Sequence, residues 1–204
     1  MTAERSAAVQ DLSFGSMTAL VTLRTERLIL RPWRESDRAP FAAINADPKA
    51  MEHFPATNTR TESDAGFDRI VAKMSAQGFG LWAVEVPGVA PFIGFVGLNP
   101  ADALLRRPVL EIGWRLAVEH WGHGYATEGG RASLAHAFDV LDQEEVVSFT
   151  TIANQRSRHV MEKLGLVRRP EEDFDHPGVP STWSGRRHVV YAITREQWRR
   201  VAEH

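Results

Sequence analysis

One segment near the middle of the 204-residue chain constrains the fold most strongly. Residues 109–118 form an apolar strand pattern that leads into a turn with alternate glycines at 121–126, followed by a helical pattern from Thr127. Alternate glycines remove Cβ atoms where backbone N–H groups converge, and the following helix adds the positive end of its dipole. This strand–turn–helix unit predicts a pyrophosphate cradle. The alternative is a helix-entry turn whose glycines only relieve steric strain.

Two common phosphate-binding motifs do not fit this turn. A dinucleotide fingerprint requires a third glycine at the position of Thr127. A P-loop requires Gly-Lys-Ser or Gly-Lys-Thr, and neither tripeptide occurs in the chain. The turn therefore matches neither motif.

Composition excludes several classes of function. With 24 Lys and Arg against 26 Asp and Glu, nothing in the charge favours nucleic acid or an anionic membrane as a partner. The chain has no cysteine, which excludes disulfides, Cys-ligated metal sites and covalent catalysis through a thiol. We see neither a secretory signal nor a run of about 18 apolar residues, and expect a cytoplasmic protein.

The remaining patterns predict a single α+β (mixed α/β) domain. Strand patterns occupy 26–31, 81–86, 92–98, 109–118, 145–152 and 188–193. Helical patterns occupy 61–77, 127–139 and 157–164, with one further helix opened at 35–37 and another opened at Thr194. Short Pro- and Gly-bearing turns indicate that the middle strands are antiparallel neighbours. We expect residues 1–20 to be a mobile or non-native tail and 21–204 to form the domain.

Taken in order, these segments resemble the GCN5-related N-acetyltransferase superfamily. The resemblance depends on Trp-Gly-His-Gly-Tyr-Ala-Thr-Glu at 121–128, Asn-Gln-Arg-Ser at 154–157 and Glu-Lys-Leu-Gly at 162–165. Similar segments at 23–33, 173–177 and 188–191 extend it over residues 23–198 and favour the branch containing ribosomal-protein N-terminal alanine acetyltransferases. Trp121 stands where the general motif has Gln or Arg, and Trp is common there in this branch.

The resemblance implies transfer of an acetyl group from acetyl-coenzyme A to an amine by direct attack in a ternary complex. It also implies a central, mostly antiparallel, twisted sheet of about six or seven strands flanked by helices, splayed by a bulge at the cofactor slot. The acceptor is a small-molecule amine or a peptide N-terminus, and the protein is a monomer or homodimer. A non-catalytic, coenzyme A-binding regulatory or degenerate module is the alternative.

The same resemblance assigns the cofactor site. Backbone groups of 116–118 pair with the pantetheine arm and polarise the thioester carbonyl, the N–H groups of 122–127 bind the pyrophosphate, and Asn154 binds pantetheine amides. The expected cofactor-binding residues are Leu116, Ala117, Val118, Trp121, Gly122, His123, Gly124, Tyr125, Ala126, Thr127, Asn154 and Ser157.

Two side chains are candidates for proton transfer. Glu111 alternates with Leu110 and Ile112, so its side chain points away from the face that they bury. Desolvation in a cleft would raise its pKa toward neutrality and make it a base, directly or through a water; the alternative is a structural carboxylate. Ser157 is a candidate proton donor to the leaving thiolate, or a simple helix cap.

Several aromatic and imidazole side chains are candidates for the acceptor pocket. They are Trp33, Phe54, Trp82, His176 and His188, with Trp183 as a further wall residue. We expect no metal site, because His120 and His123 flank the glycine turn rather than sharing a helix face.

Overall fold

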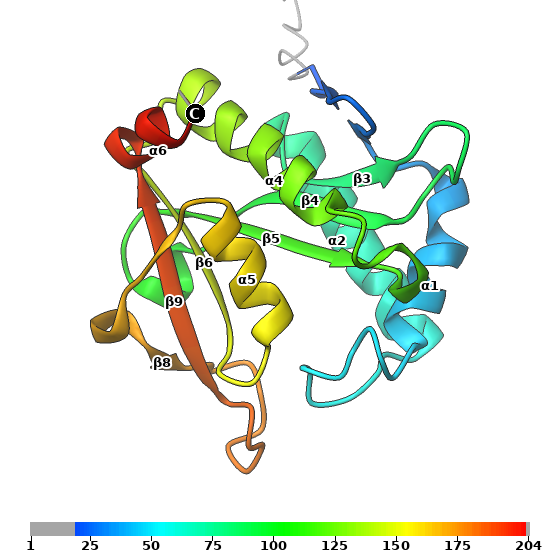
Figure 1. The fold of residues 1–204 in the computed structure, drawn as a ribbon. Helices are drawn as coiled ribbons and strands as arrows, with labels where there is room; N and C mark the ends of the chain where they lie inside the picture. The colour runs from blue at the N-terminus through cyan, green and yellow to red at the C-terminus, as the bar shows by residue number, and fades with distance from the viewer. Residues whose placement is uncertain (1–18, 203–204) are drawn as a thin grey trace, which may run out of the picture.

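The computed structural model describes residues 19–202, so nearly all of the expected N-terminal tail lies outside the described residues (Figure 1). The helices are α1 (Arg38–Ala46), α2 (Arg60–Gln77), α3 (Asp102–Leu105), α4 (Tyr125–Ala135), α5 (Gln155–Lys163) and α6 (Arg195–Ala202). The strands are β1 (Leu23–Arg24), β2 (Ile29–Arg31), β3 (Leu81–Glu85), β4 (Gly94–Pro100), β5 (Leu110–Leu116), β6 (Glu145–Thr151), β7 (Val167–Arg168), β8 (Phe174–Asp175) and β9 (Arg187–Thr194). A π-helical turn, His136–Val140, extends α4. The expected mixed α/β architecture is confirmed.

All the strands belong to one sheet. Its order is β1-β2-β3-β4-β5-β6-β9-β7, with β8 paired to β9, and every pairing except β5 with β6 is antiparallel. The part of the chain that the structure describes contributes nine strands, so the expectation of six or seven was too low. The additional strands β1, β7 and β8 have two residues each, too few to show an alternating hydrophobic pattern.

Helices cover both faces of the sheet (Figure 1). On one face α4 packs against β4 so closely that a Cβ added at Gly129 would lie 3.4 Å from the Val96 side chain. On the other face, buried Phe41 of α1 and Phe67 of α2 pack in one cluster with Phe95 of β4. Alternate residues of β4 and β5 therefore face two different environments.

Local chemistry explains why α2 begins and ends where it does. Thr59 and Glu62 form a reciprocal capping box at its start, and Gly78 ends it in the left-handed conformation with φ of 79°. Phe67 and Met74 are buried on the same helix. The helix expected over 61–77 is thus confirmed with a one-residue difference.

The sheet opens between β5 and β6. Their parallel pairing covers only Leu110 with Val146 and Glu111 with Val147, although both strands continue beyond it. Each keeps a full antiparallel partner on its other side, β4 for β5 and β9 for β6, so the sheet separates without losing those ladders. The expected splay is confirmed. The expected bulge is not in the β4–β5 ladder, whose register is continuous from Gly94–Leu116 to Pro100–Leu110.

Candidate active site

A cleft of about 670 Å³ opens where β5 and β6 separate. Its walls come from β5, β6, the glycine turn, the first turns of α5, the segment 50–55 and the segment 176–188. Of the expected site residues, those lining it are Glu111, Leu116, Trp121, Gly122, Gly124, Tyr125, Ala126, Thr127, Asn154, Ser157, Phe54, His176, His188 and Trp183. The structure thus brings most of the expected residues to one cavity.

The glycine turn presents free N–H groups at the N-terminus of α4. Gly122 and Gly124 have φ of 80° and 83°, and the first helical hydrogen bond runs from Glu128 N–H to the Gly124 carbonyl at 3.0 Å. Within residues 19–202, the N–H groups of 122–127 donate to no other residue. A Cβ added at Gly122 would meet nothing within 4 Å. Free donors, open space and a helix N-terminus are what a diphosphate requires.

Glu128 connects this turn to the segment of residues 25–27. Its carboxylate accepts hydrogen bonds from Thr25 Oγ1 at 2.6 Å and from Arg27 Nε at 2.7 Å. Arg27 Nη1 in turn donates to the His123 carbonyl at 3.0 Å. Partial burial raises the pKa of Glu128, but these hydrogen bonds outweigh it and hold the pKa below its ordinary value. The sequence contains no local signal for this contact because its partners lie about a hundred positions apart.

The hydrogen-bonding direction of β5 corrects the expected pantetheine contacts. Ala117 N–H donates to the Ile93 carbonyl at 2.9 Å, so the main chain of Ala117 faces β4. Because this direction alternates along the ladder, Trp114 and Leu116 face the slot instead. The Leu116 carbonyl already accepts from Trp121 Nε1 at 2.8 Å. Three backbone groups therefore face the slot without this contact: the N–H groups of Trp114 and Leu116 and the carbonyl of Trp114.

Trp114 was missed by the sequence reasoning, and Ala117 was wrongly included. Val118 also does not continue the strand: it begins a 3-10 turn, Val118–His120, and its carbonyl accepts from Trp121 N–H at 3.1 Å. Neither Ala117 nor Val118 lines the cleft. His123 does not line it either, and its ring stacks on Tyr125 with centroids 5.4 Å apart.

Glu111 lines the cleft on the face of β5 opposite the one covered by α4. It is paired across the ladder with Asn99, whose Oδ1 accepts a 3.0 Å hydrogen bond from Lys73 Nζ. Desolvation raises the pKa of Glu111 to about 7, while the Asn99 amide and the Lys73 charge act in the opposite direction. A carboxyl group with a pKa near neutrality can accept a proton under physiological conditions.

Asn154 is the N-cap of α5, which revises the expected roles at this end. Its Oδ1 accepts from Ser157 N–H at 3.1 Å, and its Nδ2 donates to Thr150 Oγ1 at 3.0 Å. These two bonds hold the first turn of α5, and they leave one Nδ2 hydrogen of Asn154 for a ligand such as pantetheine. Because Asn154 provides the cap, the alternative role of Ser157 as a cap is wrong, and Ser157 lines the cleft.

The expected acceptor-pocket residues divide into two groups. His176 and His188 line the cleft with ring centroids 5.1 Å apart, and burial lowers the pKa of both imidazoles. Trp82 is fully buried, and its indole donates to the Val21 carbonyl at 2.8 Å. Trp33 packs edge-on against Phe41 and donates to the Leu81 carbonyl at 2.6 Å. Trp82 is a core residue, Trp33 is partly buried against the core, and neither lines the cleft, so their assignment to the pocket was wrong.

Within residues 19–202, no group of three or more His, Asp or Glu side chains is arranged to hold a metal ion. No described helix is long and apolar enough to cross a membrane.

Known proteins that are similar to this chain in sequence include acetyltransferases. Residues 27–167 match the family described as an acetyltransferase (GNAT) domain. The FsC-acetyl coenzyme A-N(2)-transacetylase of Aspergillus fumigatus is 31% identical over 194 residues, which cover 91% of this chain and 81% of the relative.

Solved structures with the same fold include an acetyltransferase from Agrobacterium tumefaciens. It has a TM-score of 0.70 and 26% identity, with coverage of 91% of this chain and 99% of that one. RimJ of Mycobacterium smegmatis, solved in complex with CoA-disulfide, has a TM-score of 0.67 and 20% identity, with coverage of 90% and 93%.

Proposed function

The chain belongs to the GCN5-related N-acetyltransferase (GNAT) family, and we propose that its cleft transfers an acetyl group from acetyl-coenzyme A to an amine by direct attack. One observation carries the proposal. A single cleft is lined both by a turn with free N–H groups and by a carboxyl group whose pKa lies at about 7. The first fits a diphosphate and the second fits a base for an ammonium group.

The chain's backbone supplies the binding groups. The N–H groups of 122–127 hold the diphosphate, and the exposed edge of β5 at Trp114 and Leu116 pairs with the amide-bearing arm. Bound acetyl-coenzyme A supplies the activated acyl group as a thioester. The Leu116 N–H faces the slot and can donate to an oxygen on which negative charge develops.

The side chains handle the protons. Glu111 accepts the proton that the acceptor ammonium loses, directly or through a water, so that a neutral amine attacks. As the tetrahedral intermediate collapses, the C–S bond breaks and the Ser157 hydroxyl protonates the leaving thiolate. Ser157 is reprotonated by the second N–H proton that the attacking nitrogen loses on becoming an amide. Since the chain has no cysteine, a cysteine acyl-enzyme cannot form, and the acetyl group passes directly from thioester to amine.

A thiol-release assay tests this function. The protein is mixed with acetyl-coenzyme A and a panel of amines that includes free amino acids, polyamines, peptides with free N-termini, and FsC, named for the Aspergillus relative. We expect release of free coenzyme A that depends on the amine and falls in Glu111→Gln. Binding of acetyl-coenzyme A with no release for any amine would show a non-catalytic binding module.

Three expectations stay predictions. They are the extent of the domain over 21–204, a cytoplasmic location, and a monomeric or homodimeric state.

A further inference from the structure

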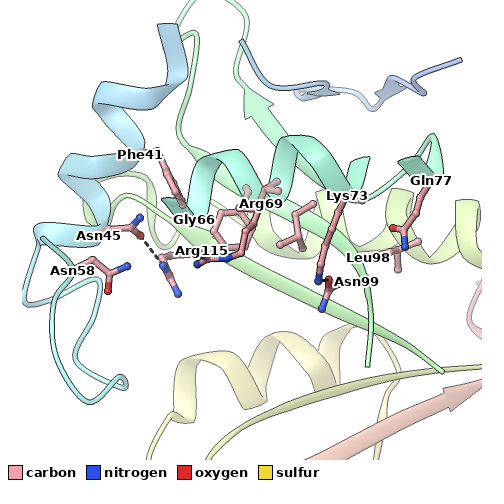
Figure 2. A pocket seen from close by; sticks show the side chains of 14 residues that line it. Phe41, Asn45, Asn58, Gly66, Arg69, Lys73, Gln77, Leu98, Asn99 and Arg115 are labelled. Atoms are coloured by element: carbon pink, nitrogen blue, oxygen red, sulfur yellow. Dashed lines mark hydrogen bonds between the residues drawn. The ribbon is translucent and has the colours of Figure 1, made fainter. Parts of the chain in front are cut away.

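A second cavity, of about 310 Å³, adjoins the cleft and shares four lining residues with it: Leu81, Phe95, Asn99 and Arg115 (Figure 2). Its wall is formed by residues of α1, α2, β3, β4 and β5 together with Asn58 and Gly80. The polar lining side chains are Asn45, Asn58, Arg69, Lys73, Gln77, Asn99 and Arg115. Three of these are cations, and no Asp or Glu is among the described residues that line the cavity. The cavity is therefore suited to a negatively charged group.

Arg115 is the central cation of this cavity. Its Nη1 donates to Asn45 Oδ1 at 2.6 Å, as Figure 2 shows, and its guanidinium lies 4.3 Å from the centroid of the Phe54 ring. Within residues 19–202 it makes no salt bridge, and its Nε is buried without a hydrogen-bond partner. Burial lowers its pKa to about 10, so the group still carries its charge at neutral pH.

A more deeply buried arginine, Arg31, shows how such a charge is compensated elsewhere in this chain. Arg31 is 3% exposed and contacts two carboxylates, Asp37 at 2.7 Å and Glu85 at 2.8 Å. A desolvated guanidinium without a counter-ion costs free energy that a bound anion would recover. Arg115 lacks the carboxylates that Arg31 has, and it faces a cavity that can admit one.

One guanidinium nitrogen remains for a ligand. Nη1 donates to Asn45, and Nε is buried against protein atoms without a hydrogen-bond partner, which leaves Nη2 without a partner among the described residues. A carboxylate oxygen that accepts from Nη2 would form a charge-assisted hydrogen bond and would supply the negative charge that the guanidinium lacks. Arg115 therefore favours an anionic group such as a carboxylate.

Arg115 lies on the same face of β5 as Glu111, the candidate base. In the β4–β5 ladder, Glu111 is paired with Asn99, Gly113 with Gly97, and Arg115 with Phe95. Gly113 has no side chain to fill the space between the two, and a Cβ added there would lie only 3.7 Å from Glu111 Oε1. Residues four positions apart on a strand are about 13 Å apart, so an acceptor that reaches from the Glu111 carboxylate to Arg115 must hold its amine and its carboxylate several bonds apart.

We propose that Arg115 and the cavity around it bind a carboxylate of the acceptor, so that the preferred substrates are amines that also carry a carboxylate. This proposal rests on the proposed function, because it places the amine of the same molecule at Glu111. Asn45 holds the guanidinium in position, and Arg69 and Lys73 add positive potential.

Matched acceptor pairs test the proposal. Glycine, β-alanine, 4-aminobutyrate, L-ornithine and L-lysine are compared with methylamine, ethylamine, propylamine, 1,4-diaminobutane and 1,5-diaminopentane, which lack only the carboxylate. In the thiol-release assay we expect at least one carboxylated member to exceed its partner about tenfold or more in kcat/KM. Equal or higher kcat/KM for every partner without a carboxylate would overturn the proposal while leaving the acetyltransferase function intact.

Variants separate charge from packing. In Arg115→Met we expect KM for the carboxylated acceptor to rise about tenfold or more, with little change for its partner. Arg115→Lys, which keeps the charge, should retain part of the preference. Arg60→Gln is the control, because Arg60 is an exposed α2 arginine paired with Asp64 outside both cavities, and its preference should equal the wild type's. An unchanged preference in folded Arg115→Met would refute the proposal.

A binding measurement gives an answer independent of turnover. Calorimetry compares N-acetyl-L-ornithine with its carboxamide, and N-acetylglycine with N-acetylglycinamide, in wild type and in Arg115→Lys. Tighter binding of at least one acid than of its amide, weakened by the substitution, supports the carboxylate site even if no amine in the panel is acetylated. No difference between acid and amide in either pair, with acetyl-coenzyme A still bound, would reject it.

Discussion

Asn99 lies directly opposite Glu111 in the β4–β5 ladder, and Lys73 donates to the Asn99 side chain at 3.0 Å. This pairing places an amide and a cation beside a carboxyl group that burial would otherwise keep protonated. The balance leaves the pKa of Glu111 at about 7, so the group exchanges its proton near neutral pH.

The pH dependence of the reaction should follow Glu111. Its carboxylate form, the base, accumulates as pH rises through about 7, so kcat/KM should increase over that range. In Glu111→Gln we expect kcat to fall about 10²- to 10⁴-fold and this rise to disappear, with acetyl-coenzyme A affinity unchanged. Asn99→Ala should move the rise to higher pH, because the amide that lowers the pKa is gone. Wild-type turnover across pH in Glu111→Gln would show that Glu111 is structural.

The glycine turn can be tested against a glycine elsewhere with the same backbone geometry. Gly122 has φ of 80° and Gly88, in the β3–β4 turn, has φ of 78°; both have open space around an added Cβ. Alanine should cost each variant about 1–2 kcal/mol of unfolding free energy, because of the left-handed backbone. Only Gly122→Ala should also weaken coenzyme A binding, measured by calorimetry. Equal affinity in the two variants would argue against the cradle.

Asn154 and Ser157 should have separable effects. Asn154→Ala removes the N-cap of α5 and should lower the unfolding free energy by about 1 kcal/mol in denaturant titrations. Ser157→Ala removes a hydroxyl that caps nothing, so stability should change by less than about 0.5 kcal/mol while kcat falls. A stability loss in Ser157→Ala equal to that in Asn154→Ala would mean that the hydroxyl is structural.

Glu128 should contribute acid-sensitive stability. Its pKa in the folded protein lies below the ordinary value, so its contribution is present above the unfolded-state pKa and is lost as pH falls through the folded-state pKa. Glu128→Gln should therefore lower Tm at pH 7, and the difference from wild type should shrink under acidic conditions where wild-type Glu128 is protonated. A Tm difference that persists unchanged at acid pH would show that charge is not the cause.

Local patterns predicted much of the fold. Alternation along β5, the cap residues of α2 and the left-handed glycine after it depend on neighbours within a few positions, and these two elements lie within one or two residues of their expected bounds. The strands that were missed, β1, β7 and β8, exist because they pair with β2 and β9, and two residues alone have no periodic signal.

Aromatic side chains were harder to place. Trp82 and Phe54 have similar apolar character in the sequence, yet Trp82 is fully buried and Phe54 is 42% exposed beside the cleft. Hydrophobicity alone does not separate a core residue from a pocket wall, because apolar side chains occur on the accessible surface of folded proteins as well as in the core. The outcome depends on which helix packs over the residue.

The sequence by itself determined the strand–turn–helix unit, the free N–H groups that follow from its glycines and the position of Glu111 on an alternating strand, because these depend on local backbone geometry. Tertiary structure alone decided that Trp114 rather than Ala117 faces the slot, since this follows from the Ala117–Ile93 hydrogen bond. It also decided that Arg115 would lie half-buried beside Asn45 without a carboxylate contact among the described residues. Both depend on partners distant in the chain, which meet only when the sheet and its helices pack together.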